Sequence, residues 1–407
     1  MNDSAGDVRR SPASTMRVAW IVPGFEGTAD EPGVPALGAL ARALAGTLNL
    51  QVFTVRYPPR AERYCLDGIP VRSFGPAAPS AGVVARRAAS AQRWGRVLAA
   101  LASEHRRAPF ALVHGFWATE PGMLATVAGR MLALPVLVSC CGGELAAARP
   151  AGYGSQLRHL ERAQVASTLH LATRIGAGSV DQHRRLLARY PWLAGRIHAL
   201  PLGYDPALFP PCDDDEAPSP GQIICIASWS PVKGHDLLLD AMRLLVARDA
   251  RAHLVLLGER TDGPAARAAV ARRGLEAHVR LLGAVPQGRV EALTRRAQVA
   301  VIASWHEAQC LAVVEALACG VPVVATPVGM ARELLREPVV GTCIAARSPA
   351  LLADALHQYL NEAQHSQESR AARRQAVAHL ALPETAQRFL SVYHDMSSRG
   401  QVVSAPH

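Results

Sequence analysis

Residues 305–329 read WHEAQCLAVVEALACGVPVVATPVG, and this stretch decides the fold. Residues 309–319 contain no helix breaker, and Gly320 stands where a left-handed C-terminal cap belongs. Pro322 then forbids continuation of the helix, so the next segment must be a new element. The stretch therefore predicts one helix that ends at Gly320.

Short apolar runs on both sides of this helix predict buried strands. Residues 299–303 and 321–325 are apolar and rich in β-branched side chains, which is typical of parallel strands buried on both faces. Open parallel sheets bind ligands at the carboxyl ends of their strands. Glu307 lies in the loop at that edge, and Glu315 follows eight residues later, about two turns up the helix.

Two carboxylates beside a helix N-terminus suit a ligand that has both hydroxyl and phosphate groups. The side chains of Glu307 and Glu315 can accept hydrogen bonds from sugar hydroxyls, while the free backbone amides of Gln309, Cys310 and Leu311 can hold phosphate oxygens. A sugar nucleotide has both parts. The spacing alone is explained equally well by a glutamate that complements the helix dipole and a second one that is simply solvated.

The same run resembles the Glu-x7-Glu signature of retaining glycosyltransferases of family 4, the glycosyl transferases group 1, which have the GT-B fold. The resemblance implies that Glu307 contacts the donor sugar, as a catalytic residue, and that Glu315 contacts the nucleotide ribose. Family members usually carry a Gly-Phe-Gly-like run after the first glutamate, where this chain has Ala308, Gln309 and Cys310. The amides of such a cradle are kept, but the close backbone approach that glycine permits is not assured.

Length and composition favour a protein with two domains, and the pattern of strands and helices described below gives the α/β class. A chain of 407 residues with 50% hydrophobic and 19% charged residues can bury two cores. Its net charge of +10 suits a diphosphate ligand, an acidic membrane surface or nucleic acid. The sequence has no stacking-aromatic motif and no zinc-ligand spacing, so we expect no nucleic-acid partner.

Cysteine usage and the N-terminus indicate a cytoplasmic protein. Eight cysteines occur without a Cys-x-x-Cys pair, and several lie in apolar segments, as reduced thiols do. Residues 1–15 lack an apolar h-region and are expected to form a tail. Residues 83–107 interleave arginines with apolar residues, which fits either an anionic membrane surface at the inner face of the membrane or an ordinary solvated helix.

Alternating strand-length and helix-length segments predict parallel sheets with helices on both faces. The resemblance implies two Rossmann-like domains of this kind that face a cleft. Residues 210–221 are rich in proline, acid and serine and predict a linker, and the acidic triplet 213–215 is expected to be solvated and not to bind a metal. The resemblance implies that the first domain binds the acceptor, the second the donor, and that the last helix returns to the first domain. The expected segments are a tail at 1–15, the acceptor domain at 16–209, the linker at 210–221, the donor domain at 222–378, the returning helix at 379–396 and a tail at 397–407.

The resemblance also places four first-domain residues at the cleft. Gly33 is what remains of the family's Gly-Gly pair in the loop after the first strand. His114 lies in a segment similar to one that lines the cleft, and Cys141 and Glu144 fall where the family has a His-Gly-x-Asp/Glu run that faces the donor sugar. A hydrogen-bonded structural histidine and an inert buried thiol are the simpler alternatives.

Lys233 is the only lysine among 43 basic residues, and it lies in a loop at the carboxyl end of a predicted strand. A compact ammonium on a flexible stem suits a diphosphate. The segment resembles the family's Gly-Arg-Leu-x-x-x-Lys-Gly pattern, whose arginine and lysine bind the donor diphosphate. Lys233 matches, whereas Ser228 replaces the arginine. Neutralisation of the diphosphate then falls to Lys233, the amides near Gln309 and another arginine.

The resemblance implies transfer of a sugar from a UDP- or GDP-sugar to a glycan, lipid-linked or small-molecule acceptor. Residues 23–40 contain no histidine and no well-placed base, so we expect retention of anomeric configuration, and the chemistry requires no metal or other cofactor. The departures at Ser228, Cys141 and 308–310 also fit a catalytically degenerate protein that binds or scaffolds in polysaccharide synthesis.

Overall fold

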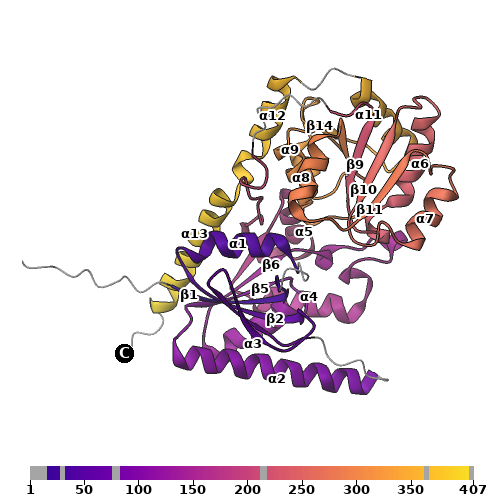
Figure 1. The fold of residues 1–407 in the computed structure, drawn as a ribbon. Coiled ribbons are helices and arrows are strands. Elements are labelled where there is room, and N and C mark those ends of the chain that lie inside the picture. Colours follow the sequence, from indigo (N-terminus) through magenta and orange to yellow (C-terminus); the bar gives the residue numbers. More distant parts are fainter. Residues whose placement is uncertain (1–15, 28–32, 76–82, 211–217, 362–365, 403–407) are drawn as a thin grey trace, which may run out of the picture.

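The computed structural model describes residues 16–27, 33–75, 83–210, 218–361 and 366–402. It contains two α/β domains, with the first sheet in the lower part of Figure 1 and the second in the upper part. The first sheet has the order β3-β4-β2-β1-β5-β6-β7-β8, and its strands are β1 (Arg17–Gly24), β2 (Asn49–Tyr57), β3 (Arg63–Leu66), β4 (Ile69–Ser73), β5 (Leu112–Phe116), β6 (Val136–Cys140), β7 (Arg174–Ala177) and β8 (Ile197–Ala199).

The second sheet is parallel throughout and has the order β11-β10-β9-β12-β13-β14. Its strands are β9 (Gln222–Ile226), β10 (His253–Leu257), β11 (Val279–Gly283), β12 (Val299–Ile302), β13 (Val323–Ala325) and β14 (Gly341–Cys343). In the first sheet the pair β3 and β4 is antiparallel, and the other neighbouring strands are parallel.

Helices cover both faces of each sheet because the strands are apolar on both sides. Two buried clusters lie on opposite faces of the first sheet and two on opposite faces of the second. The α-helices of the first domain are α1 (Pro35–Ala45), α2 (Val83–Arg107), α3 (Glu120–Leu132), α4 (His159–Leu171) and α5 (Val180–Arg189). Those that follow are α6 (His235–Val246), α7 (Pro264–Ala271), α8 (Gln287–Arg295), α9 (Leu311–Ala318), α10 (Ala331–Leu334), α11 (Pro349–Asn361), α12 (Gln367–Val377) and α13 (Leu382–Val402).

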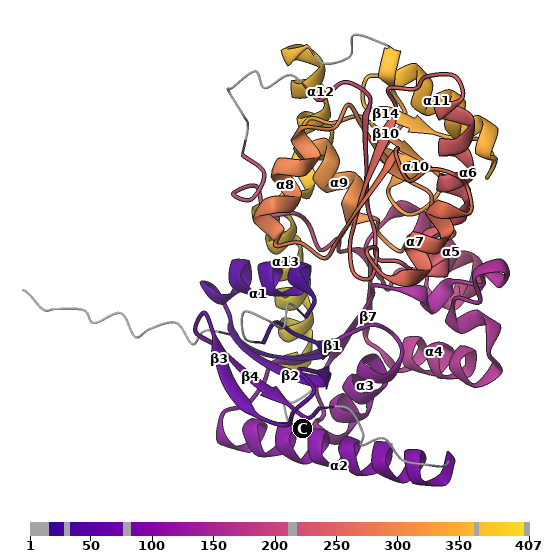
Figure 2. The ribbon, with the colours of Figure 1, turned by 45° about the vertical axis from the view of Figure 1, so that its right-hand side comes forward.

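The last helix, α13, runs from the second domain down along the first (Figures 1 and 2). Its apolar face joins the core of the first domain, where Phe389 and Tyr393 are fully buried beside Trp20. The hydroxyl of Tyr393 accepts a hydrogen bond from Trp20 Nε1 at 3.0 Å. The ends of the described chain therefore meet in one core, although this helix follows the second sheet in sequence.

The predicted alternation of strands and helices is observed, with further elements that include the four-residue helix α10. Strands β3 and β14 escaped the sequence analysis because they are only four and three residues long. Helix α12 forms within the expected donor domain, in a segment for which no helix was expected, and Ser366 caps it by accepting a hydrogen bond from Ser369 N at 3.1 Å. Residues 1–15 and the acidic triplet 213–215 lie outside the described residues. Among the described helices, none has the length and apolar character needed to cross a membrane.

Candidate active site

Helix α9 begins at Leu311, two residues later than the sequence suggested, because Cys310 adopts a left-handed conformation with φ of 69°. That region is costly for a residue with a side chain and common for glycine. Cys310 thus adopts a backbone conformation that glycine favours, at a position where the resemblance implies a glycine. At the other end Gly320 has φ of 75°, so the predicted C-terminal cap is confirmed.

Lys233 and Glu307 come from separate loops and form an ion pair, with Nζ 2.7 Å from Oε1. Lys233 ends a short turn after β9, where Gly234 takes φ of 67° and brings the chain against the carbonyl oxygen of Ala303. The hydroxyl of Ser304 donates to the same Oε1 of Glu307 at 2.6 Å. Lys233 and Glu307, which the sequence analysis singled out on separate grounds, are therefore in direct contact.

The pair leaves capacity for a ligand. An ammonium has three donors, and the bond to Glu307 uses one of those of Lys233. Burial lowers the pKa of Lys233, but the carboxylate of Glu307 outweighs it, so the net pKa lies above its usual value. Lys233 is therefore charged at neutral pH and can contact an anion while Glu307 stays in place.

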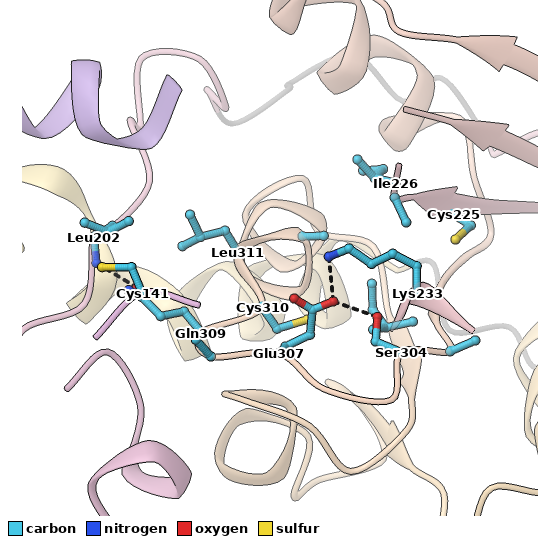
Figure 3. A pocket seen from close by; sticks show the side chains of 15 residues that line it. Cys141, Leu202, Cys225, Ile226, Lys233, Ser304, Glu307, Gln309, Cys310 and Leu311 are labelled. Carbon is cyan, nitrogen blue, oxygen red and sulfur yellow. Dashed lines mark hydrogen bonds and ion pairs between the residues drawn. The ribbon is translucent and has the colours of Figure 1, made fainter. Parts of the chain in front are cut away.

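A cavity of about 260 Å³ joins this pair to the helix N-terminus and to the first domain. Figure 3 shows Lys233 and Ser304 pointing to Glu307 on one side of the cavity. Cys141 and Leu202 lie on the opposite side. The first amides of α9 have no partner within the helix, and the cavity is lined there by 308–312. Positive charge and free backbone donors thus face the same space. The cavity is lined by Cys141, Leu202, Cys225, Ile226, Ala227, Lys233, Ile302, Ala303, Ser304 and 307–312.

Glu315 lies one turn beyond these amides, on the same side of α9 as Leu311 and Ala312. No ion pair or hydrogen bond to its side chain occurs among the described residues. Its exposure is intermediate, and burial raises its pKa to about 7. A carboxylate in this position lacks a partner until hydroxyl donors reach it.

We expect Glu315→Gln to raise the stability of the ligand-free protein at pH 8. The folded state holds the pKa of this carboxyl at about 7, above its ordinary value of 4.5. The folded protein therefore loses stability as pH rises from 4.5 to 7, and the loss persists above pH 7. Thermal melts should show a higher melting temperature for the variant at pH 8, with the difference vanishing at pH 4. Glu276→Gln, at an exposed position, is the control. An equal change in melting temperature in both variants would contradict the raised pKa of Glu315.

Gln309 uses its side chain to join the two domains. Its Oε1 accepts a hydrogen bond from Leu202 N at 2.9 Å, and a Cβ added to Gly178 would lie 2.2 Å from its Cδ. Its carbonyl oxygen accepts from Met330 N at 2.9 Å. The side chain thus points toward Leu202, as Figure 3 shows, and only the backbone of Gln309 is suited to hold a phosphate.

Further bonds tie this loop to the first domain. Ser179 Oγ donates to the carbonyl oxygen of Ala308 at 2.8 Å, and His306 Nε2 lies 3.3 Å from the carbonyl oxygen of Gly142. Burial lowers the pKa of His306, so a neutral ring donates this bond. The loop that carries Glu307 is therefore positioned by both domains.

His114 and Glu144, which were expected at the cleft, are buried inside the first domain. His114 is fully buried, and its ring nitrogens lie 2.7 Å from the Tyr393 hydroxyl and 2.9 Å from Ser139 Oγ. Glu144 is 1% exposed, and its carboxylate accepts hydrogen bonds from backbone amides, including Cys141 N at 3.1 Å and Gly142 N at 2.7 Å. His114 anchors α13, and Glu144 holds the loop after β6, because their polar atoms are already occupied by the protein.

The other sequence candidates divide between cavity and loop. Cys141 lines the cavity, and burial raises the pKa of its thiol well above the usual value, so it is an uncharged wall residue. Gly33 has φ of 53° and packs against the backbone of Phe25, outside the cavity lining. Ser228 also lies outside that lining, and its carbonyl oxygen accepts a hydrogen bond from His235 Nε2 at 2.9 Å.

The sequence analysis missed Tyr153 and Arg347. Tyr153 lies in an irregular segment, and burial, followed by the charges of Glu144 and Glu307, raises its pKa. Its ring packs against Gly143, where a Cβ would come within 2.8 Å, and the glycine pair 142–143 was the available signal. Arg347 donates to the carbonyl oxygens of Ala303 and Ser304 at 2.7 and 2.5 Å. The sequence analysis expected another arginine to help neutralise the diphosphate. Arg347 lies near the site, but its guanidinium is hydrogen-bonded to the loop at Ala303 and Ser304.

Among the described residues, no three His, Cys, Asp or Glu side chains are grouped as metal ligands. The cavity is lined by the ammonium of Lys233, the carboxylate of Glu307, the hydroxyl of Ser304 and the first residues of α9, and Glu315 lies outside this lining, further along the same helix. Such a set can bind a phosphate and hydroxyl-bearing ligand.

Comparisons with known proteins identify the second domain. Residues 214–376 match the model of Glycosyl transferases group 1. A D-inositol 3-phosphate glycosyltransferase from Jonesia denitrificans is 30% identical over 49% of this chain and 51% of its own length. The chain spans about half the length of the first curated relatives it matches.

Solved structures cover nearly the whole chain. Sucrose-phosphate synthase from Thermosynechococcus elongatus aligns over 94% of this chain and all of its own, with a TM-score of 0.74 and 20% identity. HepE from Anabaena, solved in complex with UDP-glucose, aligns over 93% of this chain and all of its own, with a TM-score of 0.69 and 17% identity. The predicted GT-B fold is confirmed, and so is the family resemblance read from residues 305–329.

Proposed function

Because this chain carries a Glycosyl transferases group 1 domain, we propose that it transfers a sugar from a nucleotide-sugar donor to a glycan, lipid-linked or small-molecule acceptor. The observation that carries the proposal is the single cavity that contains Lys233, Glu307 and the N-terminus of α9. HepE, a neighbour in fold, was solved with UDP-glucose, which supports a nucleotide sugar as donor.

In this proposal the diphosphate lies against Lys233 and the first amides of α9. Both stabilise negative charge, and charge develops on the diphosphate as its bond to the anomeric carbon breaks. Glu307 Oε1 already accepts bonds from Lys233 and Ser304, which fixes the carboxylate and directs Oε2 to a donor-sugar hydroxyl. Glu315 accepts the ribose hydroxyls, which supply the partners that it otherwise lacks.

The acceptor binds from the first domain, where Cys141 and Leu202 line the cavity. Its hydroxyl oxygen attacks the anomeric carbon from the face that the diphosphate leaves, and its proton passes to the departing phosphate oxygen. The new bond then has the configuration of the old one. Holding both substrates in this geometry is the main contribution of the protein.

Neutralisation by Lys233 and the amides predicts that catalysis needs no divalent ion. We expect purified protein to transfer sugar, or slowly hydrolyse the donor, in EDTA, and an α-linked donor to give an α-linked product. The anomeric proton coupling in NMR reads the configuration. A β-linked product, or activity restored only by manganese or magnesium, contradicts the mechanism. Donor binding without turnover across acceptors supports the scaffold alternative instead.

A further inference from the structure

A second concavity, of about 490 Å³, lies in the first domain between α2, the edge strand β3 and its neighbour β4. Figures 1 and 2 show α2 along the side of this domain that faces away from the second domain. The lining includes three arginines from three elements, Arg63 of β3, Arg72 of β4 and Arg96 of α2, together with Phe74. None of these residues lines the donor cavity.

The three arginines line this hollow from three neighbouring elements. Arg63 and Arg72 are paired directly across the antiparallel strands β3 and β4. Like charges in this position repel each other and destabilise a sheet. Arg72 and Arg96 flank one aromatic ring, with their Cζ atoms 5.4 and 5.8 Å from the centroid of Phe74. The fold thus concentrates positive charge around one hollow.

Glu62 also lines the hollow, and it and the nearby Glu104 form ion pairs with other arginines. Glu62 Oε1 lies 3.1 Å from Arg60 Nε, and Glu104 pairs with Arg17 at 3.4 Å and with Arg107 at 3.6 Å. Across the part of the chain that the structure describes, Arg63, Arg72 and Arg96 form no ion pair.

The electrostatics agree with this geometry. Burial, followed by the charge of Arg63, lowers the pKa of Arg72, with Glu104 acting in the opposite direction and Arg96 adding to the fall. A bound anion would remove the repulsion that the strand pairing imposes. Planar guanidinium groups bind phosphate through paired, charge-assisted hydrogen bonds.

We propose that Arg63, Arg72 and Arg96 form a binding site for a phosphate group, separate from the donor cavity. The phosphate belongs either to a free phosphorylated compound or to a lipid headgroup, and the chemistry of recognition is the same in both. The site does not depend on the proposed transferase activity.

The test uses the full chain and a matched pair of double variants. Arg63→Gln with Arg72→Gln removes two charges from the site, and Arg280→Gln with Arg289→Gln removes two exposed charges elsewhere. Inorganic phosphate is titrated calorimetrically at constant ionic strength, and melting temperatures are measured with and without phosphate. We expect the site variant to bind phosphate at least about tenfold more weakly, as loss of charged hydrogen bonds implies.

Two further readouts separate this role from a structural one. Without phosphate, the site variant should melt no lower than the parent, because the substitution removes repulsion. Because both double variants keep Lys233 in the other cavity, the difference between their phosphate affinities measures binding at the arginine site alone. Phosphate affinity equal in the two double variants, combined with equal vesicle binding, overturns the proposal.

Vesicles distinguish the two sources. Phosphatidylcholine vesicles with and without phosphatidylglycerol are sedimented with each protein. Binding only to the anionic vesicles, lost in the site variant and kept in its control, assigns the site to a lipid headgroup. Phosphate binding lost in the site variant, without vesicle binding by the parent, assigns it to a free phosphorylated compound.

Discussion

Lys233→Ala should reduce kcat/KM for sugar transfer by about a hundredfold or more, as loss of one preorganised donor to a developing negative charge does. Lys233 is the only lysine, its Nζ lies 2.7 Å from Glu307, and its pKa keeps it charged at neutral pH. The substitution removes the ammonium from the leaving diphosphate and also leaves Glu307 with Ser304 as its remaining partner.

Two controls separate chemistry from folding. Lys233→Met keeps the apolar stem and should lose as much activity as Lys233→Ala. Lys233→Arg keeps a charge and should recover part of the rate. Melting temperatures of all three are measured beside steady-state kinetics, so a folding defect is recognised. If Lys233→Ala retains activity within threefold of the parent, Lys233 has no part in the mechanism.

Glu307→Gln should lower kcat by roughly tenfold to a hundredfold while leaving nucleotide affinity unchanged or improved. The amide can still accept the hydrogen bond from Ser304, but it no longer neutralises Lys233, which becomes available to the diphosphate in the ground state. An interaction made more strongly in the transition state than in the ground state appears in kcat.

Glu315→Gln is the matched comparison, since it removes the other carboxylate eight residues along the chain. It should weaken binding of the nucleoside diphosphate, because the ribose hydroxyls lose a charged acceptor, with a smaller effect on kcat. Calorimetric titration with the nucleotide and steady-state kinetics give both quantities. Equal nucleotide affinity in the parent and both variants would defeat this division of roles.

The sequence predicted the second domain well because its signals are local. The glycine cap and the proline after α9, the apolar strands that flank it and the single lysine each depend on a few neighbouring residues. Periodicity and turn chemistry are short-range, so they can be read without coordinates. The missed strand β14 has only three residues, which is too short for periodicity to show.

The first-domain residues were harder to place because a strand end does not reveal where a side chain points. His114 follows the expected strand, yet its ring is occupied by Tyr393, which lies 279 positions later in the chain. Glu144 matches the family pattern, yet backbone amides of its own and a neighbouring loop occupy its carboxylate. Partners so distant in sequence, or set by loop geometry, leave no local pattern.

The sequence alone determined the two parallel-sheet domains, the helix with its two glutamates and the candidacy of Lys233. The tertiary structure decided that Lys233 and Glu307 form a pair, that Gln309 connects the domains and that Cys310 takes a glycine-like backbone. It also brought Arg63, Arg72 and Arg96 around one hollow. Helices and strands depend mainly on interactions between residues that are close in sequence. The electrostatic environment of a charged group depends instead on segments that are distant in sequence and that packing of the cores brings within a few ångströms of it.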